Sequence, residues 1–335
     1  MRLVFSLLFS LFLLQSFAFA QVPDKWFSAA LARSDGFAIA QNEAQNAKLR
    51  LQRLKTDPFI TKPLLLEATT ALELSEARVI AARLEVRRGL WQDAFSCTST
   101  QDTLEVALAK LDLADTNAKA ANARLKTGAI TAAEFNRAEA DLRASQSEVT
   151  SAQAEAAAAS EVLKNRLGFV PDNKTPNQAI VRPSRQMLER NLEFGVRTIE
   201  AKGALARAKL DLEIKDNEYS ALAEITEAKR VVANSERNLA DIRNSSKAIF
   251  LTRWENYGSA SSALTARDRA VALAKDELKT QNERLQRGLI SKLVVLQARV
   301  NLAQQLAAFE QSRQRLALAV LELAVLVNLD IWQSA

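Results

Sequence analysis

The decapeptide NARLKTGAIT at residues 122–131 returns 160 residues later as NERLQRGLIS at residues 282–291. The register holds further along the chain, where Leu142 corresponds to Leu302. Self-similarity at a fixed spacing is the signature of a duplicated structural unit. The chain is therefore expected to consist of two equivalent units, and their architecture is the main guide to function.

Composition favours few and long helices. The chain of 335 residues holds only 8 Gly and 6 Pro, well below the roughly 7% and 5% of an average protein. Ala, Leu, Glu, Lys, Arg and Gln, which are strong helix formers, are abundant. We therefore expect an all-α fold with little or no β-structure.

Apolar residues before Gly128 recur at alternating spacings of three and four. Large Leu104 and Leu111 alternate with small Ala107 and Ala114. Such a seam is typical of a coiled coil in which small residues permit the close approach of two helices. The pattern continues after the glycine and returns in the second unit, so each unit is expected to form an antiparallel coiled-coil hairpin.

Glycine and hydroxyl residues mark the turn of each hairpin. Gly128 and Gly288 are expected to end one helix, because glycine is common just after a helix C-terminus. Thr131 and Ser291 are then expected to cap the start of the next helix. Glu134, three residues after Thr131, completes a capping box in the first unit only.

The other breaks divide each unit into a helix, a short loop, a very long helix, the glycine tip and a last helix. The segment 57–63 contains two prolines and stops the first helix, and polar residues at 215–219 form a weaker break in the second unit. Between Pro63 and Gly128 the long helix would measure about 95 Å. The predicted organisation is residues 21–171 for the first helical repeat, 172–183 for a linker and 184–335 for the second repeat.

The first residues have the pattern of a secretory signal peptide. Arg2 precedes an apolar run from Leu3 to Phe19, and the small-x-small sequence Ala18-Phe19-Ala20 ends it. A membrane anchor is the alternative, although the run is barely long enough to span a bilayer. Residues 1–20 are therefore expected to be a signal peptide, and the mature chain is expected to be exported.

The residue types on which many catalytic sites depend are missing. The chain has no His and a single Cys, Cys97, which excludes Ser-His-Asp and Cys-His catalysis and any imidazole metal site. No grouping of Asp and Glu stands apart from ordinary helix surface charge. We therefore expect no enzymatic activity, no cofactor and no metal, and we expect Cys97 to be a small buried residue. The net charge of +6 comes from Lys and Arg interleaved with acidic residues, so nucleic acid is not an expected partner.

With both tips identified, the chain resembles the TolC-type outer-membrane efflux proteins. In that family, two repeats each place a long helix down through the periplasm, a turn at the tip and a returning helix. The family's tip pattern is an arginine or aromatic residue, a glycine, a small or apolar pair and Ser/Thr. It is matched at 124–131 and again at 284–291, each followed by Ala/Leu spacing such as Ala138 to Leu142. The resemblance covers essentially residues 24–331 and implies the fold of a TolC-like α-barrel protomer.

The resemblance also implies partners and a location. It implies a homotrimer that works with a periplasmic adaptor (a membrane fusion protein) and an inner-membrane pump, in the periplasm or associated with the outer membrane. The helical tips would meet the adaptor. The tip residues so implied are Arg124, Leu125, Gly128, Ile130, Thr131, Arg284, Leu285, Gly288, Leu289, Ile290 and Ser291. The plainer alternative is that these residues only turn and cap the hairpins.

The chain departs from the family where the first helix of each repeat joins the long one. The family has a pair of transmembrane strands there, which needs more than about twenty residues. The joins at 56–63 and 215–219 are far shorter. The first join also carries Phe59 and Ile60, an apolar end for which contact with a membrane or a separate pore is a hypothesis.

Two functions from different classes therefore remain open. One is a component of an efflux or export system that forms a periplasmic helical conduit in an envelope-spanning transport assembly. The other is a non-transporting structural scaffold of the cell envelope that keeps the efflux fold without the membrane-spanning strands.

Overall fold

The computed structural model describes residues 24–171 and 182–332. The expected signal peptide and most of the expected linker lie outside these ranges. Within them every regular element is a helix and no strand occurs, which confirms the all-α prediction. The first repeat holds α1 (Asp24–Ala32), α2 (Asp35–Thr56), α3 (Lys62–Lys126) and α4 (Ala132–Leu167), and the second holds α5 (Arg185–Asn191), the 3-10 turn η2 (Leu192–Phe194), α6 (Val196–Lys215), α7 (Leu222–Gln286) and α8 (Lys292–Val327).

The helix bounds repeat at the same spacing as the sequence. α3 and α7 are each 65 residues long, and α4 and α8 are each 36 residues long. α3 begins at Lys62 and α7 at Leu222, whereas α4 begins at Ala132 and α8 at Lys292. At 1.5 Å per residue, the two longest helices measure about 97 Å. The predicted tandem repeat of long helical hairpins is confirmed.

The helix ends follow local rules. Thr61 precedes α3 in an extended conformation, and Pro63 lies in the first turn of the helix. Backbone N–H groups of the first turn have no acceptor within the helix, so a proline there costs no hydrogen bond. After α4 and α8 the chain turns left-handed at Gly168 (φ 76°) and at Asn328 (φ 51°). Glycine and asparagine are the residues that most readily take this conformation at a helix end.

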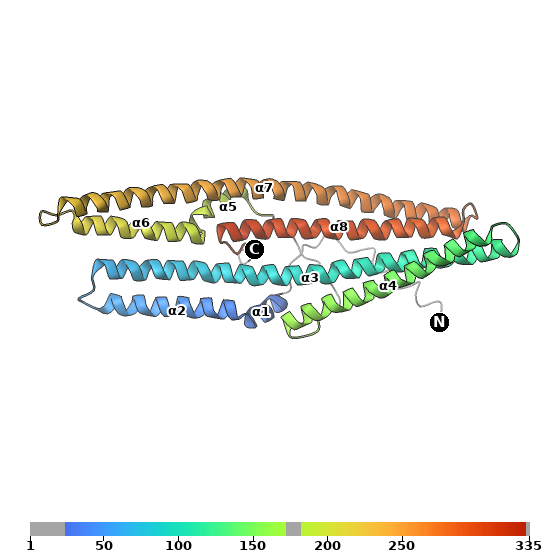
Figure 1. Ribbon diagram of the computed structural model, residues 1–335, viewed down its shortest axis with the longest axis horizontal. Helices are drawn as coiled ribbons and strands as arrows, with labels where there is room; N and C mark the ends of the chain where they lie inside the picture. Colours follow the sequence, from blue (N-terminus) through green and yellow to red (C-terminus); the bar gives the residue numbers. More distant parts are fainter. Residues whose placement is uncertain (1–23, 172–181, 333–335) are drawn as a thin grey trace.

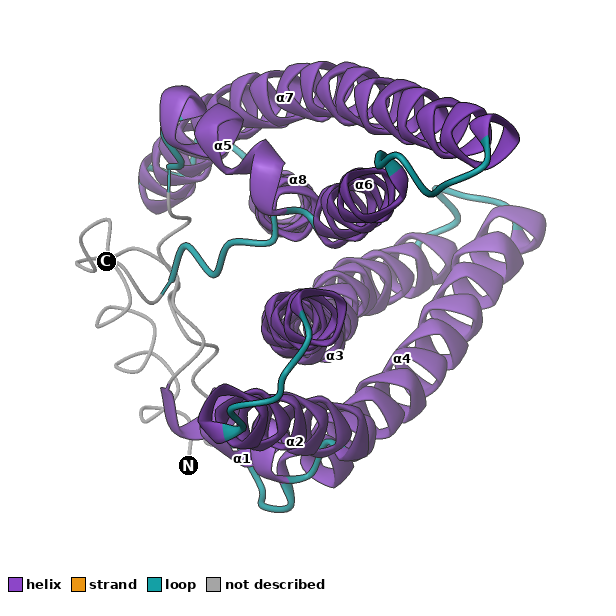
Figure 2. Cartoon of the chain, turned by 90° about the vertical axis from the view of Figure 1, so that its left-hand side faces the viewer, coloured by secondary structure: helices purple, strands orange, loops and turns teal. Residues whose placement is uncertain are grey.

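The helices form a rod whose long axis follows α3 and α7 (Figure 1). α3 packs against α2 along its first part and against α4 along its last part, and α7 packs in the same way against α6 and α8. Both glycine tips lie at one end of the rod, and the α2–α3 and α6–α7 loops lie at the other (Figure 1). The two repeats meet through α3, which contacts both α8 and α6 (Figure 2). Each long helix thus has neighbours along its length, as a helix that is marginal alone requires.

The main hydrophobic core lies where the two repeats, α1 and the end of the described chain meet. Trp91 of α3 is buried there, with its ring edge-on to Phe95 and Trp332 at centroid distances of 5.7 and 5.5 Å. Phe250 of α7 and Cys97 belong to the same core. The expectation of a buried Cys97 is confirmed.

A smaller core lies along the predicted coiled-coil seam. Ala107 of α3 is buried against Val149 and Ala152 of α4, and Leu104 and Leu111 pack around them. The small side chains allow the close approach of α3 and α4 that the sequence pattern predicted.

Candidate partner-binding tips

The first tip is built by the end of α3. The Gly128 N–H donates to the Leu125 carbonyl at 3.0 Å, and the Ala129 N–H donates to the Arg124 carbonyl at 2.8 Å. This pair of bonds is a Schellman motif, which satisfies the last carbonyls of a helix. Gly128 has φ +71°, a conformation that costs a residue with a Cβ about 1–2 kcal/mol.

The second tip, at the end of α7, has the same backbone geometry. The Gly288 N–H donates to the Leu285 carbonyl and the Leu289 N–H donates to the Arg284 carbonyl, both at 2.9 Å. Gly288 also has φ +71°. Both glycines therefore end their helices as the sequence predicted, and the duplication extends to the backbone of the turn.

The two tips differ in how the next helix starts. At α4, the Glu134 N–H donates to Thr131 Oγ1 at 3.3 Å, and the Thr131 N–H donates to a Glu134 carboxylate oxygen at 2.7 Å. These bonds to Thr131 hold the pKa of the Glu134 carboxyl below its usual value. At α8 the side chain of Ser291 makes no capping hydrogen bond, and Val294 stands where the first tip has its glutamate. The predicted capping box in the first unit alone is confirmed.

The exposed groups of the tips follow the duplication as well. In both tips the arginine, the glycine and the hydroxyl residue are exposed, whereas the leucine before the glycine and the isoleucine after it are half-buried. Leu289 is 66% exposed, and the first tip has the smaller Ala129 at the same place. Each tip thus offers an exposed arginine and a small polar turn. The second tip adds the exposed Arg287, where the first has Thr127, and the apolar Leu289.

A groove beside the tips joins the two repeats. It has a volume of about 680 Å³, and Lys110 of α3 and Glu148 of α4 form an ion pair of 2.6 Å in its lining. Next to it, Arg299 of α8 pairs with Asp112 of α3 at 3.6 Å. The groove was not predicted, because α8 contributes its wall from the other repeat. The lining residues are Lys110, Leu113, Ala114, Asn117, Asp141, Ala144, Ser145, Glu148, Leu293, Val294 and Gln297.

Over residues 24–171 and 182–332, no group of three or more His, Cys, Asp and Glu side chains is arranged so that it could hold a metal ion. Burial raises the pKa of the Cys97 thiol, so this thiol is held in its less reactive protonated form. In the same ranges, no helix combines the length and the apolar character needed to cross a membrane.

Comparisons with known proteins identify the fold. No family model matches the sequence, and no curated protein matches it. The outer membrane protein VceC from Vibrio cholerae is similar in structure at 14% identity, with 91% of this chain and 95% of VceC covered and a TM-score of 0.62. CusC, whose structures concern folding and transmembrane channel formation, is similar at 14% identity over 94% of this chain and 96% of its own, with a TM-score of 0.64.

Further solved structures show the same likeness. The outer-membrane channel OprN is similar at 13% identity over 91% of this chain and 89% of its own, with a TM-score of 0.62. At these identities the likeness concerns the fold. This chain therefore has the helical fold of TolC-type outer-membrane channel proteins. The fold that the resemblance implied is confirmed.

Proposed function

We propose that this protein is a component of a TolC-like efflux or export system, exported to the periplasm or associated with the outer membrane, where three copies form a helical conduit. One observation carries the proposal. Two tips with the same Schellman turn stand at one end of a rod, on a fold shared over more than nine-tenths of the chain with outer-membrane channel proteins. A scaffold would need hairpin turns, but it would not need two exposed tips with matching groups at the same end.

Exposed apolar side chains along the rod support assembly with further copies. Leu273 on α7 is 71% exposed, and Leu251 on α7 and Val162 on α4 are also exposed. α4 and α7 lie on the outside of the protomer (Figure 2), so these side chains are accessible to neighbouring subunits. In the proposed homotrimer the six longer helices of each protomer would surround a lumen together with those of the other two copies. These helices are α2, α3, α4, α6, α7 and α8.

The tips are the proposed meeting point with a periplasmic adaptor, which in turn would connect to an inner-membrane pump. Arg124 and Arg284 are exposed, so their guanidinium groups are available for carbonyl or carboxylate oxygens of a partner. Leu289 would supply an apolar contact in the second tip. In this proposal the tip residues bind a partner in addition to turning the chain.

The first test is the mass and the shape of the mature protein, residues 21–335, in solution. Light scattering would give the mass and negative-stain imaging the shape. A trimer that forms a hollow rod of roughly 100 Å or more, by the helix-rise estimate, would support the conduit. A monomer or dimer without a lumen would contradict it.

The second candidate function, a structural scaffold of the cell envelope that does not transport, is favoured by one observation. The α2–α3 and α6–α7 joins comprise only residues 57–61 and 216–221. A photo-reactive amino acid placed at Leu289 in cells would separate the candidates. Crosslinks from Leu289 to one envelope protein that are lost in the variant Arg284→Ala would favour the efflux component. No crosslink from Leu289 to another protein would favour the scaffold.

A further inference from the structure

The end of the rod opposite the tips carries two exposed aromatic side chains at equivalent positions of the two repeats. Phe59 in the α2–α3 loop is 90% exposed, and Tyr219 in the α6–α7 loop is 96% exposed. They are the two most exposed of the large apolar side chains in the described parts of the chain. A single exposed apolar side chain is common on a protein surface. A nearly fully exposed aromatic side chain that recurs at the same position of both repeats marks this end of the rod as a candidate contact surface.

The same local turn holds both aromatic residues. The Phe59 N–H donates to Asp57 Oδ1 at 2.9 Å, and the Tyr219 N–H donates to Asn217 Oδ1, also at 2.9 Å. Each is an Asx turn, in which the side-chain oxygen of Asp or Asn accepts a hydrogen bond from the backbone N–H two residues later. The two aromatic side chains therefore stand on defined turns, and the turns are duplicated along with the helices.

The two loops are held at the same end of the rod by contacts between the repeats. Lys62, at the start of α3, pairs with Glu213, near the end of α6, at 2.9 Å. Figure 1 shows both loops beyond the ends of α2 and α6, at the end of the long axis. Leu222, which follows the second loop, is 79% exposed. Three exposed apolar side chains, Phe59, Tyr219 and Leu222, thus lie in or next to the two loops at this end of the rod.

We propose that this end of the rod rests on a lipid bilayer, with Phe59 and Tyr219 inserted at the membrane interface. Two side chains that protrude from separate loops do not form the contiguous area of about 800 Å² per partner that a specific protein contact buries. A bilayer interface accepts single aromatic side chains, because each can place its ring among the headgroups. The inference rests on the proposed location in the cell envelope and is independent of transport.

The charges around the two loops indicate how the contact would be made. Lys55, Lys62 and Lys215 stand against Asp57, Asp216 and Glu218, so the loops and the residues beside them carry no excess of positive charge. Attraction to anionic headgroups therefore contributes little, and apolar insertion supplies the affinity. Binding should accordingly depend only weakly on salt and on the fraction of anionic lipid.

The test is flotation of the mature protein with phosphatidylcholine vesicles, with and without anionic phosphatidylglycerol. The wild type is expected to bind both kinds of vesicle and to remain bound in high salt. The double variant Phe59→Ser with Tyr219→Ser is expected to bind at least about tenfold more weakly, from the apolar area that each ring would lose. Phe59→Trp with Tyr219→Trp should restore binding, and its additional tryptophan fluorescence should shift to the blue when vesicles are added.

Ile39→Ser supplies the matched control, since Ile39 is 58% exposed and lies near the start of α2, away from both ends of the rod. It should leave vesicle binding unchanged, and melting curves should show all variants folded. The proposal would be overturned by a wild type that ignores vesicles, by a double serine variant that binds as well, or by binding that needs anionic lipid and low salt. Each of these results leaves the trimer and the tips untouched, so it is distinguishable from failure of the proposed function.

Discussion

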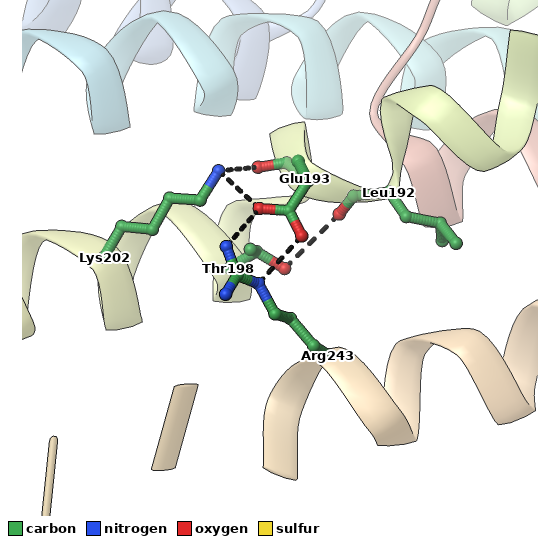
Figure 3. Close-up of polar contacts among 5 residues, drawn as sticks. All are labelled: Leu192, Glu193, Thr198, Lys202 and Arg243. Atoms are coloured by element: carbon green, nitrogen blue, oxygen red, sulfur yellow. Dashed lines mark hydrogen bonds and ion pairs between the residues drawn. The ribbon is translucent and has the colours of Figure 1, made fainter. Parts of the chain in front are cut away.

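Arg243 of α7 holds the Glu193 carboxylate with two parallel hydrogen bonds, from Nε at 2.8 Å and from Nη2 at 2.7 Å (Figure 3). Lys202 of α6 approaches the same carboxylate at 2.7 Å and donates to the Glu193 carbonyl at 3.0 Å. The three side chains join the turn η2 to α6 and α7. They therefore hold the bend where the second repeat passes from its short helix into its hairpin.

The first prediction concerns this bend. The bonds from Arg243, with further support from Lys202, lower the pKa of Glu193 to about 2. A lowered carboxyl pKa contributes stability above the unfolded value of about 4.3, and that contribution is lost as pH falls through about 2. Since the groups are 40% and 48% exposed, we expect Glu193→Gln to cost only about 1 kcal/mol at pH 7.

Denaturant unfolding of Glu193→Gln, Arg243→Gln and the double variant at pH 7 would measure the coupling between the two side chains. The coupling should disappear near pH 2. An equal coupling at both pH values would show that the ionised carboxylate is not its source.

The second prediction concerns the boundary between the repeats, where α3 and α8 pack. Burial, together with the nearby carboxylates of Glu310 and Glu105, raises the pKa of Asp102 of α3 to about 7, and Arg313 of α8 opposes this shift. A raised carboxyl pKa contributes stability below the unfolded value of about 3.9, and this contribution is lost as pH rises through 7. The free energy of unfolding should therefore fall between pH 5 and pH 8.

Asp102→Asn should remove much of this fall and stabilise the protein at pH 8 by roughly 1–2 kcal/mol, after allowance for the part of the group that solvent screens. Thermal unfolding at a series of pH values would measure it. Glu105→Gln is the matched control, because Glu105 is exposed on the next turn of α3. A larger effect from Glu105→Gln than from Asp102→Asn would contradict the assignment.

The third prediction concerns the glycines at the tips. Gly128→Ala and Gly288→Ala should each cost about 1 kcal/mol of stability, because both positions have φ +71° and a Cβ disfavours the left-handed region. A Cβ at either position would meet nothing within 4 Å, so the cost comes from the backbone alone. Gly258→Ala, inside α7 and equally open, should instead stabilise by about 0.5–1 kcal/mol. Melting temperatures of the three variants would check the opposite signs.

The fourth prediction compares the two helix starts. Thr131→Ala removes the side-chain oxygen that accepts from the Glu134 N–H and should cost about 1 kcal/mol. Ser291→Ala should cost clearly less, since the Ser291 side chain makes no capping bond. Chemical denaturation of the two variants gives the comparison. Equal losses would show that the capping box contributes nothing beyond a hydroxyl at the N-cap.

Much of the fold follows from local rules that a sequence displays directly. The glycines at 128 and 288, the hydroxyl caps and the proline at 63 each act within a few residues, so the long helices and their tips could be placed in advance. The short helices α1 and α5 were missed. Ser34 is a sequence signal for the start of α2, because its Oγ accepts a hydrogen bond from the Phe37 N–H at 3.3 Å. The break between η2 and α6 lies at Gly195, and a lone glycine is a weaker signal.

The amino-acid sequence by itself determined the helical class, the duplication and the turn geometry of this protein, because helix propensity, capping and left-handed turns depend on neighbouring residues. Only the tertiary structure decided how the repeats meet. It placed Asp102 close to Glu310 of the other repeat, set the start of α8 beside the α3–α4 hairpin to form the groove, and brought the loops of Phe59 and Tyr219 to one end. These relationships depend on which faces of distant helices pack together. That choice is made by the summed burial of many apolar side chains, Trp91 and Phe250 among them, rather than by any single motif.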